Sequence, residues 1–193
     1  MKKFLLLIIT LLFTIQAFSQ TALIVGDRAP EFIATDNSGH TINLKVLLKS
    51  NKAVVLFFYR GQWCPYCNKQ IMHLQDSLQL LTAKGAYVIG VTPETNENIG
   101  KTLEKTKASF SIIQDQNYKI MKAFNVNYVV DDKMFGKLKG YGIDLEKNNG
   151  NADHVLPVPA TYIIDNTGKI IFAHFDKDYT KRPSVSSLLA ALN

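Results

Sequence analysis

The chain has 193 residues, of which 47% are hydrophobic and 20% charged, and its formal net charge is +6. These fractions are typical of a globular protein and argue against a disordered tail, a collagen-like repeat or a multispan membrane protein. The length suits one domain whose core needs no disulfide staples. The chain has only two cysteines, which can supply neither a disulfide framework nor a four-cysteine zinc site.

The first 19 residues have the features of a secretory signal peptide. Two lysines open the segment, residues 4–18 are mostly apolar, and small side chains at Ala17 and Ser19 precede a predicted cleavage before Gln20. The apolar run is shorter than the ~20 residues of a membrane-spanning helix, which argues against an uncleaved anchor. Removal of residues 1–19 leaves 20 basic and 16 acidic residues, a net charge of about +4. We therefore expect a periplasmic or secreted protein with no stable membrane anchor after cleavage.

Along the rest of the chain, strand patterns alternate with helix patterns. The predicted strands are 41–44, 53–59, 86–91, 111–114, 161–164 and 169–175, and the predicted helices are 64–84, 94–107, 118–124 and 186–192. The run at 53–59 (AVVLFFY) is continuously apolar, which is typical of a strand buried on both faces. This order predicts an α/β fold with a mixed, mostly parallel central sheet and helices on both faces. Residues 20–193 are expected to form one domain, with an inserted loop at about 125–152 that contains one helical turn.

The sequence predicts no nucleic-acid partner. Three lysines lie between Lys101 and Lys107 on one predicted helix, and a solvated helix face accounts for them. An exported protein would also rarely meet nucleic acid.

The two cysteines form a Cys-x-x-Cys pair where the buried strand gives way to a helix. Unpaired backbone N–H groups and the helix dipole at a first turn favour a thiolate, and this is the position of Cys64. Pro65 suits the first helical turn, and Arg60 adds a positive charge that favours the anion. Cys67 lies nearly one turn further on, where it can attack a sulfenic acid or mixed disulfide formed on Cys64. Trp63 is expected to pack beside the pair and to line a docking surface.

Two other interpretations of the pair were weighed. A structural disulfide would close so short a loop that it would remove little chain entropy, and it would be a weak staple. A metal half-site lacks a second cysteine pair. We therefore expect a redox site without a metal or another cofactor.

Pro159 lies just before the predicted strand 161–164. A proline there, in a chain with a redox cysteine pair, suggests a cis bond at Val158-Pro159, which would turn the backbone toward the sulfurs. An ordinary trans loop proline is the alternative, and the sequence leaves both open.

Three segments together resemble the peroxiredoxin-like branch of the alkyl hydroperoxide reductase / thiol-specific antioxidant (AhpC/TSA) family, within the thioredoxin-fold superfamily. They are GDRAPEF, FFYRGQWCPYCNKQ, and LPVPATYIIDNTGKI with the following FDKDYTKRP. The resemblance implies a thioredoxin-like fold, a peroxidatic or nucleophilic role for Cys64 and a resolving role for Cys67. It also places Pro159 at the thioredoxin cis-proline.

The chain departs from the family pattern in two places. Typical peroxiredoxins have a proline and a hydroxyl residue upstream of the reactive cysteine, where this chain has Arg60-Gly61-Gln62-Trp63. They also have an arginine before the later strand, where this chain has Pro159. Both changes move the site toward thioredoxin, and we hypothesise that Arg60 replaces the missing guanidinium.

The sequence thus predicts a thiol-dependent peroxidase in which Cys64 becomes a sulfenic acid and Cys67 resolves it as a disulfide. Its expected partners are a peroxide and an external, thioredoxin-like dithiol reductant. A thiol-disulfide oxidoreductase acting on protein disulfides is the second expectation. A non-catalytic binding domain with a structural disulfide is the third.

Overall fold

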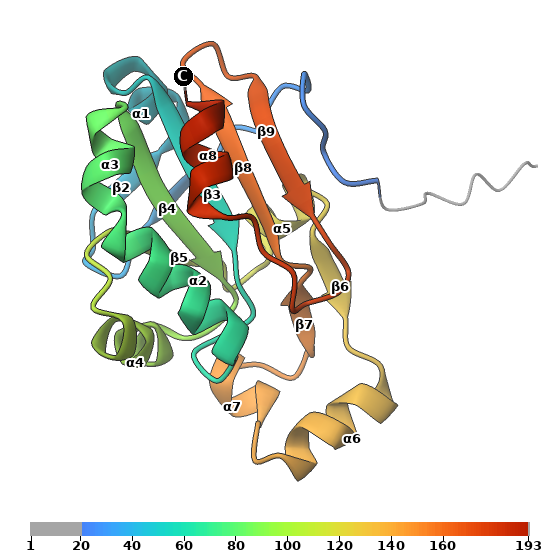
Figure 1. Cartoon of the computed structure of the whole chain (residues 1–193). Coiled ribbons are helices and arrows are strands. Elements are labelled where there is room, and N and C mark those ends of the chain that lie inside the picture. Colours follow the sequence, from blue (N-terminus) through green and yellow to red (C-terminus); the bar gives the residue numbers. More distant parts are fainter. Residues whose placement is uncertain (1–20, 193) are drawn as a thin grey trace, which may run out of the picture.

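The computed structural model describes residues 21–192 and is built around one five-stranded sheet (Figure 1). The predicted signal peptide, residues 1–19, lies outside the described residues. The strands are β1 (Ile33–Thr35), β2 (Thr41–Asn43), β3 (Ala53–Phe58), β4 (Ala86–Thr92), β5 (Ser111–Gln114), β6 (Asn127–Val129), β7 (Val155–Pro157), β8 (Ala160–Asp165) and β9 (Ile170–Phe175). The helices are α1 (Leu44–Ser50), α2 (Pro65–Asp76), α3 (Leu78–Ala83), α4 (Asn96–Thr106), α5 (Lys119–Ala123), α6 (Asp132–Gly140), α7 (Leu145–Asn149) and α8 (Val185–Ala191).

The main sheet has the order β5-β4-β3-β8-β9, and β3 lies at its centre. The pairs β3–β4 and β4–β5 are parallel, whereas β3–β8 and β8–β9 are antiparallel. The predicted mixed sheet is therefore confirmed, but the expectation that it is mostly parallel is wrong. The β8–β9 hairpin is antiparallel, and its strand β8 also pairs antiparallel with β3. The sheet therefore has two antiparallel and two parallel pairs.

All six residues of β3 are buried because the sheet is covered on both faces. Val55 and Phe57 point into a core formed with α2, α3, α4 and α8, while Leu56 and Phe58 point into a second core formed with α1 and α5. This division follows from the alternation of side chains along a strand. The predicted cover of helices on both faces is confirmed. The loop that leads from β3 to the cysteine pair, residues 59–64, departs from one end of this buried strand.

The structure differs from the sequence prediction at two places in the helices. The segment after β2 is a helix, α1, because Asn43 caps it by accepting a hydrogen bond from Val46 N, and Leu44 and Leu48 bury one face. The predicted helix 64–84 is divided into α2 and α3 at Ser77, whose backbone has left the helical region.

The predicted insertion, residues 125–152, contains more regular structure than one helical turn. It includes β6, which pairs with β7, and the helices α6 and α7. These elements lie at one end of the molecule, below the main sheet in Figure 1, and surround a small core of Val130, Leu138, Leu145 and Leu156. Among residues 21–192, no helix is long and apolar enough to cross a membrane.

Candidate active site

The cysteine pair lies at the end of the sheet where two parallel strands both finish. The register pairs Phe58 of β3 with Val91 of β4, and Tyr59 N donates to Val91 O at 3.0 Å. The loops that follow the two strands therefore meet at this edge. One loop leads through Arg60 to Cys64 and the other contains Glu94.

The first turn of α2 holds both sulfurs inside the protein. Cys64 is the N-cap of the helix and Pro65 its first residue, as the sequence predicted for the proline. The carbonyl of Cys64 accepts hydrogen bonds from the N–H groups of Cys67 and Asn68, each at 3.1 Å. Cys64 is 1% exposed and Cys67 is fully buried, and the two are not joined by a disulfide in this structure.

The surroundings of the two sulfurs favour a negative charge on Cys67 over one on Cys64. The hydrogen bond with Cys67, followed by burial, raises the pKa of Cys64 well above its ordinary value. Burial also opposes the ionisation of Cys67. The hydrogen bond from Cys64, the charge of Arg182 and a backbone hydrogen bond from Arg60 outweigh that burial and lower the pKa of Cys67 to about 6. The expectation of a lowered pKa at Cys64 is therefore wrong, because its hydrogen bond with Cys67 and its burial outweigh the favourable charge of Arg60.

Arg182 supplies the guanidinium that contacts a sulfur. Its Nη2 donates to Cys67 Sγ at 3.4 Å and its Nε to Gln70 Oε1 at 2.7 Å. Gln70 in turn donates to Thr161 Oγ1 of β8 at 3.0 Å. Sequence analysis missed this residue, since Arg182 lies 115 residues after Cys67 and only the fold brings them together. The basic FDKDYTKRP segment was the available signal.

Arg60, which the sequence assigned to this guanidinium role, is directed elsewhere. Its guanidinium carbon lies 4.8 Å from the ring centroid of Trp63 and 4.4 Å from that of Tyr179. Its charge favours ionisation of Cys64, but it is the last of the contributions to that pKa. Arg60 therefore ties the active-site loop to the C-terminal segment by cation–π contacts.

Trp63 packs on two cores at once. It is half-buried against the core that contains Cys64 and Cys67 and also against the small core of the insertion. The expected position beside the cysteines is confirmed, and the side chain joins the insertion to the active-site loop.

The Val158–Pro159 bond is trans, so the cis conformation suggested by the sequence is wrong. The segment instead runs on from β7 into β8, and Val158 N donates to Val126 O at 2.7 Å. This N–H group is therefore already paired and is not available to a substrate. Since Phe58 is opposite Ala160, Pro159 still lies at the sheet end that carries the cysteines.

A buried carboxyl group, which the sequence gave no reason to select, completes the site. Glu94 is 0% exposed, and its Oε2 accepts from Gln62 N at 2.7 Å. Its Oε1 has no hydrogen-bond partner within residues 21–192. Burial raises the pKa of Glu94 to about 8 despite the Gln62 hydrogen bond, and the charge on Cys67 adds to the rise.

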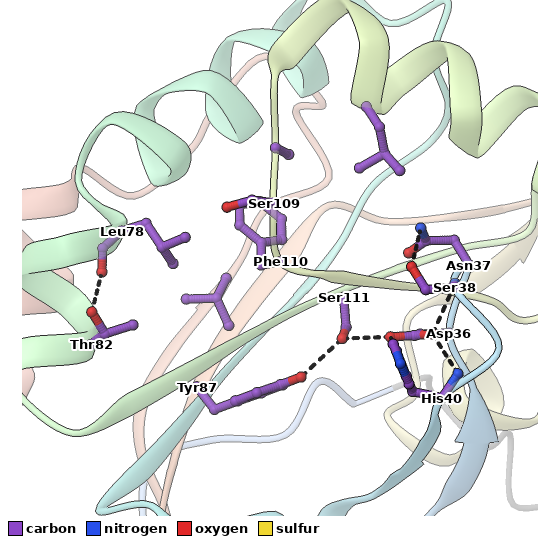
Figure 2. Close-up of a pocket in the computed structure, with 13 residues that line it drawn as sticks. Asp36, Asn37, Ser38, His40, Leu78, Thr82, Tyr87, Ser109, Phe110 and Ser111 are labelled. Carbon is purple, nitrogen blue, oxygen red and sulfur yellow. Dashed lines mark hydrogen bonds and ion pairs between the residues drawn. The ribbon is translucent and has the colours of Figure 1, made fainter.

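A separate cavity of about 450 Å³ is not lined by either cysteine. Figure 2 shows Asp36 at one side of it, hydrogen-bonded to the 36–40 turn and to Ser111, which also contacts Tyr87. Burial of Asp36 is outweighed by these hydrogen bonds, which lower its pKa. This hydrogen-bond network connects the turn between β1 and β2 to β4 and β5, so its role is to stabilise the fold.

A Cys-x-x-Cys pair at the N-terminus of the helix after the central strand, in a sheet of this order, defines a thioredoxin-fold thiol protein. Residues 25–173 match the AhpC/TSA family model, and the chain belongs to that family. It is accordingly an enzyme of the peroxiredoxin group, as the family resemblance of its sequence predicted.

Relatives named peroxiredoxins agree with the family assignment, and solved structures agree with the fold. The chain is 29% identical to peroxiredoxin Bcp of Bacillus subtilis over 147 residues, which cover 76% of this chain and 82% of the relative. It is 28% identical to the chloroplastic peroxiredoxin Q of Sedum lineare over 125 residues, or 65% and 64% of the two chains. Peroxidoxin BcpB of Mycobacterium tuberculosis has the same fold, with a TM-score of 0.67, 21% identity and coverage of 87% and 95%. The thioredoxin domain of a thiol-disulfide oxidoreductase from Bacteroides vulgatus superposes with a TM-score of 0.59 at 18% identity, covering 89% and 100%.

Proposed function

We propose that the chain reduces hydroperoxides through its Cys64–Cys67 pair and is regenerated by an external, thioredoxin-like dithiol. The observation that carries the proposal is the buried dithiol at the N-terminus of α2, in which Arg182 and the Cys64 hydrogen bond stabilise one anion. Membership of the AhpC/TSA family supports a peroxide as the electron acceptor.

Cys64 is the residue proposed to attack. It caps the helix and lies nearer the surface than Cys67, and its thiol proton already faces the Cys67 anion. As the Cys64 sulfur bonds to one peroxide oxygen, the O–O bond breaks and the proton passes through Cys67 to the leaving alkoxide. The products are an alcohol and a sulfenic acid on Cys64.

Cys67 then resolves the intermediate. Its thiolate attacks the Cys64 sulfur, the S–S bond forms and hydroxide leaves, taking up a proton to become water. Two electrons have passed from the sulfurs to the peroxide, and a dithiol partner returns them by exchange with the disulfide.

Single-turnover mixing with hydrogen peroxide tests the proposal, with the fluorescence of Trp63 as the signal. We expect a rate constant far above that of free cysteine. The Cys67→Ser variant should accumulate a sulfenic acid on Cys64, whereas Cys64→Ser should not. A wild-type rate equal to that of free cysteine would reject the peroxidase proposal, and a sulfenic acid in Cys64→Ser alone would reverse the two roles.

A second candidate is thiol-disulfide exchange with protein disulfides, favoured by the Cys-x-x-Cys spacing and by the thioredoxin-domain fold. In this reaction Cys64 attacks a disulfide instead of a peroxide and forms a mixed disulfide, from which Cys67 displaces the substrate thiol in place of hydroxide. Reduction of insulin disulfides without rapid oxidation by peroxide would favour it. A reduction potential below about −300 mV would instead favour an inert structural disulfide.

Export of the protein is also proposed, on the pattern of residues 1–19. Sequencing of the mature N-terminus tests it, with Gln20 as the expected first residue. An intact start at Met1 in the cytosolic fraction would contradict it.

A further inference from the structure

Glu94 is the buried ionisable group at the active site for which the proposed reaction has no role. Its carboxyl is attached to the loop that leads to Cys64 through the 2.7 Å hydrogen bond from Gln62 N. The unpartnered Oε1 lies against the backbone at Gly61. A Cβ placed on Gly61 would lie 2.5 Å from both this oxygen and Trp63 Nε1, which is also unpartnered within residues 21–192. The loop thus encloses the carboxyl group and leaves one of its oxygens unsatisfied.

An ionised carboxylate in this position would be costly, because each unsatisfied buried lone pair has lost its hydration. The charged and titratable groups that act on Glu94 come from three neighbouring elements. Cys67 on α2 repels a negative charge, and Lys101 and Lys105 on α4 attract one. Tyr59, just after β3, has a pKa held high by burial and by the Glu94 charge. Burial is the largest influence, and with the Cys67 charge it raises the pKa of Glu94 to about 8, so the carboxyl is protonated at neutral pH in the reduced protein.

We propose that Glu94 is a redox-linked proton store for the cysteine pair. It holds a proton while the pair is reduced and releases it when the pair becomes a disulfide. Burial opposes ionisation of Glu94 in both redox states, and formation of the disulfide removes the Cys67 anion, which is the like charge that adds to this effect. The proposal requires only that the pair cycles between dithiol and disulfide, so it deepens the proposed function without depending on peroxide as the oxidant.

The proposed reaction releases one hydroxide ion, and Glu94 can supply the proton that this ion needs. The Cys64 thiol, the Cys67 thiolate and a hydroperoxide yield a disulfide, an alcohol and one hydroxide. A proton from Glu94 converts that hydroxide into water and leaves a carboxylate. Reduction of the disulfide then reverses the proton transfer. Glu94 acts through Gln62 and through the charge on Cys67, so it is a positioning and proton-storing residue rather than a catalytic one.

Infrared difference spectroscopy on the wild-type protein tests the proposal directly. The reduced protein at neutral pH should show the carbonyl band of a protonated carboxyl, and oxidation with a dithiol/disulfide buffer should remove it. The Glu94→Gln variant, which keeps an acceptor for Gln62 N, should lack the change. Glu97→Gln is the matched control, because Glu97 is an exposed carboxyl close by that pairs with Lys101, and it should keep the change. An equal band in both redox states would overturn the proposal.

Redox titration against a dithiol reference gives a second measurement that a purely structural role would not affect. Just below the pKa of Glu94, about 8, reduction should take up one proton more than it does above this pH. The equilibrium constant should therefore change by an additional factor of ten per pH unit there, about 30 mV, and Glu94→Gln should lack this step. Because neither measurement uses peroxide, failure of the peroxidase proposal and failure of the proton store are distinguishable.

Discussion

The contact between Arg182 and Cys67 is one of the interactions that favour the Cys67 thiolate. The Arg182 guanidinium lies 3.4 Å from the Cys67 sulfur and is held by Gln70. Since an opposite charge at this distance stabilises a thiolate, Arg182→Gln should raise the pKa of Cys67 from about 6 by one unit or more. The ultraviolet absorbance of the thiolate as a function of pH measures this shift.

Two variants serve as comparisons for that titration. Lys181→Gln removes an exposed neighbouring cation and should leave the curve unchanged. Arg60→Ala should move it less than Arg182→Gln, because the Arg60 guanidinium stacks on Trp63 and Tyr179. The hypothesis that Arg60 replaces the family's guanidinium is wrong if Arg60→Ala reacts with peroxide at the wild-type rate. An unchanged titration in Arg182→Gln would contradict the role given to Arg182.

Gly61 permits the close approach of Glu94 to the active-site loop. A Cβ at this position would lie 2.5 Å from Glu94 Oε1 and from Trp63 Nε1. Gly61→Ala should therefore displace one of these side chains and cost about 1–3 kcal/mol of stability, as overpacking does. Urea denaturation measures the effect.

Gly100 provides the opposite case on α4. A Cβ there meets no atom within 4 Å, so Gly100→Ala should stabilise the protein by about 0.5–1 kcal/mol, because alanine loses less backbone entropy in a helix. A Gly61→Ala variant as stable as the wild type would show that the loop can accommodate the methyl group.

At the scale of elements, the insertion and the active-site loop share Trp63. Leu145 of α7 is fully buried in the small core against which Trp63 packs. Leu145→Ala should leave a cavity there, at a cost of about 2–5 kcal/mol, and loosen the insertion while the main sheet stays intact. Trp63 is the only tryptophan of the chain, so a change in its emission reports this effect directly.

Hydrogen exchange locates the same change in the backbone. Amides of residues 130–156 should exchange faster in Leu145→Ala, whereas those of β3 should not. Met134→Ala is a suitable control, because Met134 lies on α6 and is 36% exposed. Identical Trp63 emission in Leu145→Ala and the wild type would argue against coupling between the insertion and the site.

The elements also show what local sequence could predict. Periodicity identified β3 and β4, whose apolar runs are long and uninterrupted, and α2, whose apolar residues recur at spacings of three and four. It missed α1, where the helix depends on the Asn43 cap, and it missed the interruption at Ser77. Boundaries of this kind depend on single hydrogen bonds and tertiary packing, which a short window of sequence does not contain.

At the scale of the whole molecule, the site also depends on tertiary contacts that a short window of sequence does not contain. Cys64, Cys67 and Pro65 were predictable because their chemistry depends on neighbours in the sequence. Arg182 and Glu94 were not, because only the parallel pairing of β3 with β4 and the return of the C-terminal segment place them near the sulfurs. The assignment of the negative charge to Cys67 depends on the hydrogen bond from Cys64 and on Arg182, whereas the sequence alone assigned it to Cys64.

Glu94 also makes the stability of the folded protein depend on pH. Its pKa is raised from 4.5 to about 8 in the folded state, so the folded state binds more protons than the unfolded state between these values. Its contribution is therefore complete below about pH 4.5 and is lost as the pH rises through 8. The loss amounts to about 1.4 kcal/mol per pH unit within the window. Cys67 has the opposite effect above about pH 6, because its pKa is lowered from 9.0.

The difference between Glu94→Gln and the wild type reports the glutamate together with its interaction with Cys67, because the other contributions of the cysteines are common to both proteins. Urea denaturation of the reduced proteins at several pH values should show the variant gaining stability relative to the wild type from about pH 5 to about pH 8. Glu97→Gln should run parallel to the wild type over this range. The pKa of Glu97 is lowered in the folded state, so its contribution is already complete above the unfolded value. A constant difference between Glu94→Gln and the wild type would mean that Glu94 is ionised throughout, and the proton it is proposed to store would not exist.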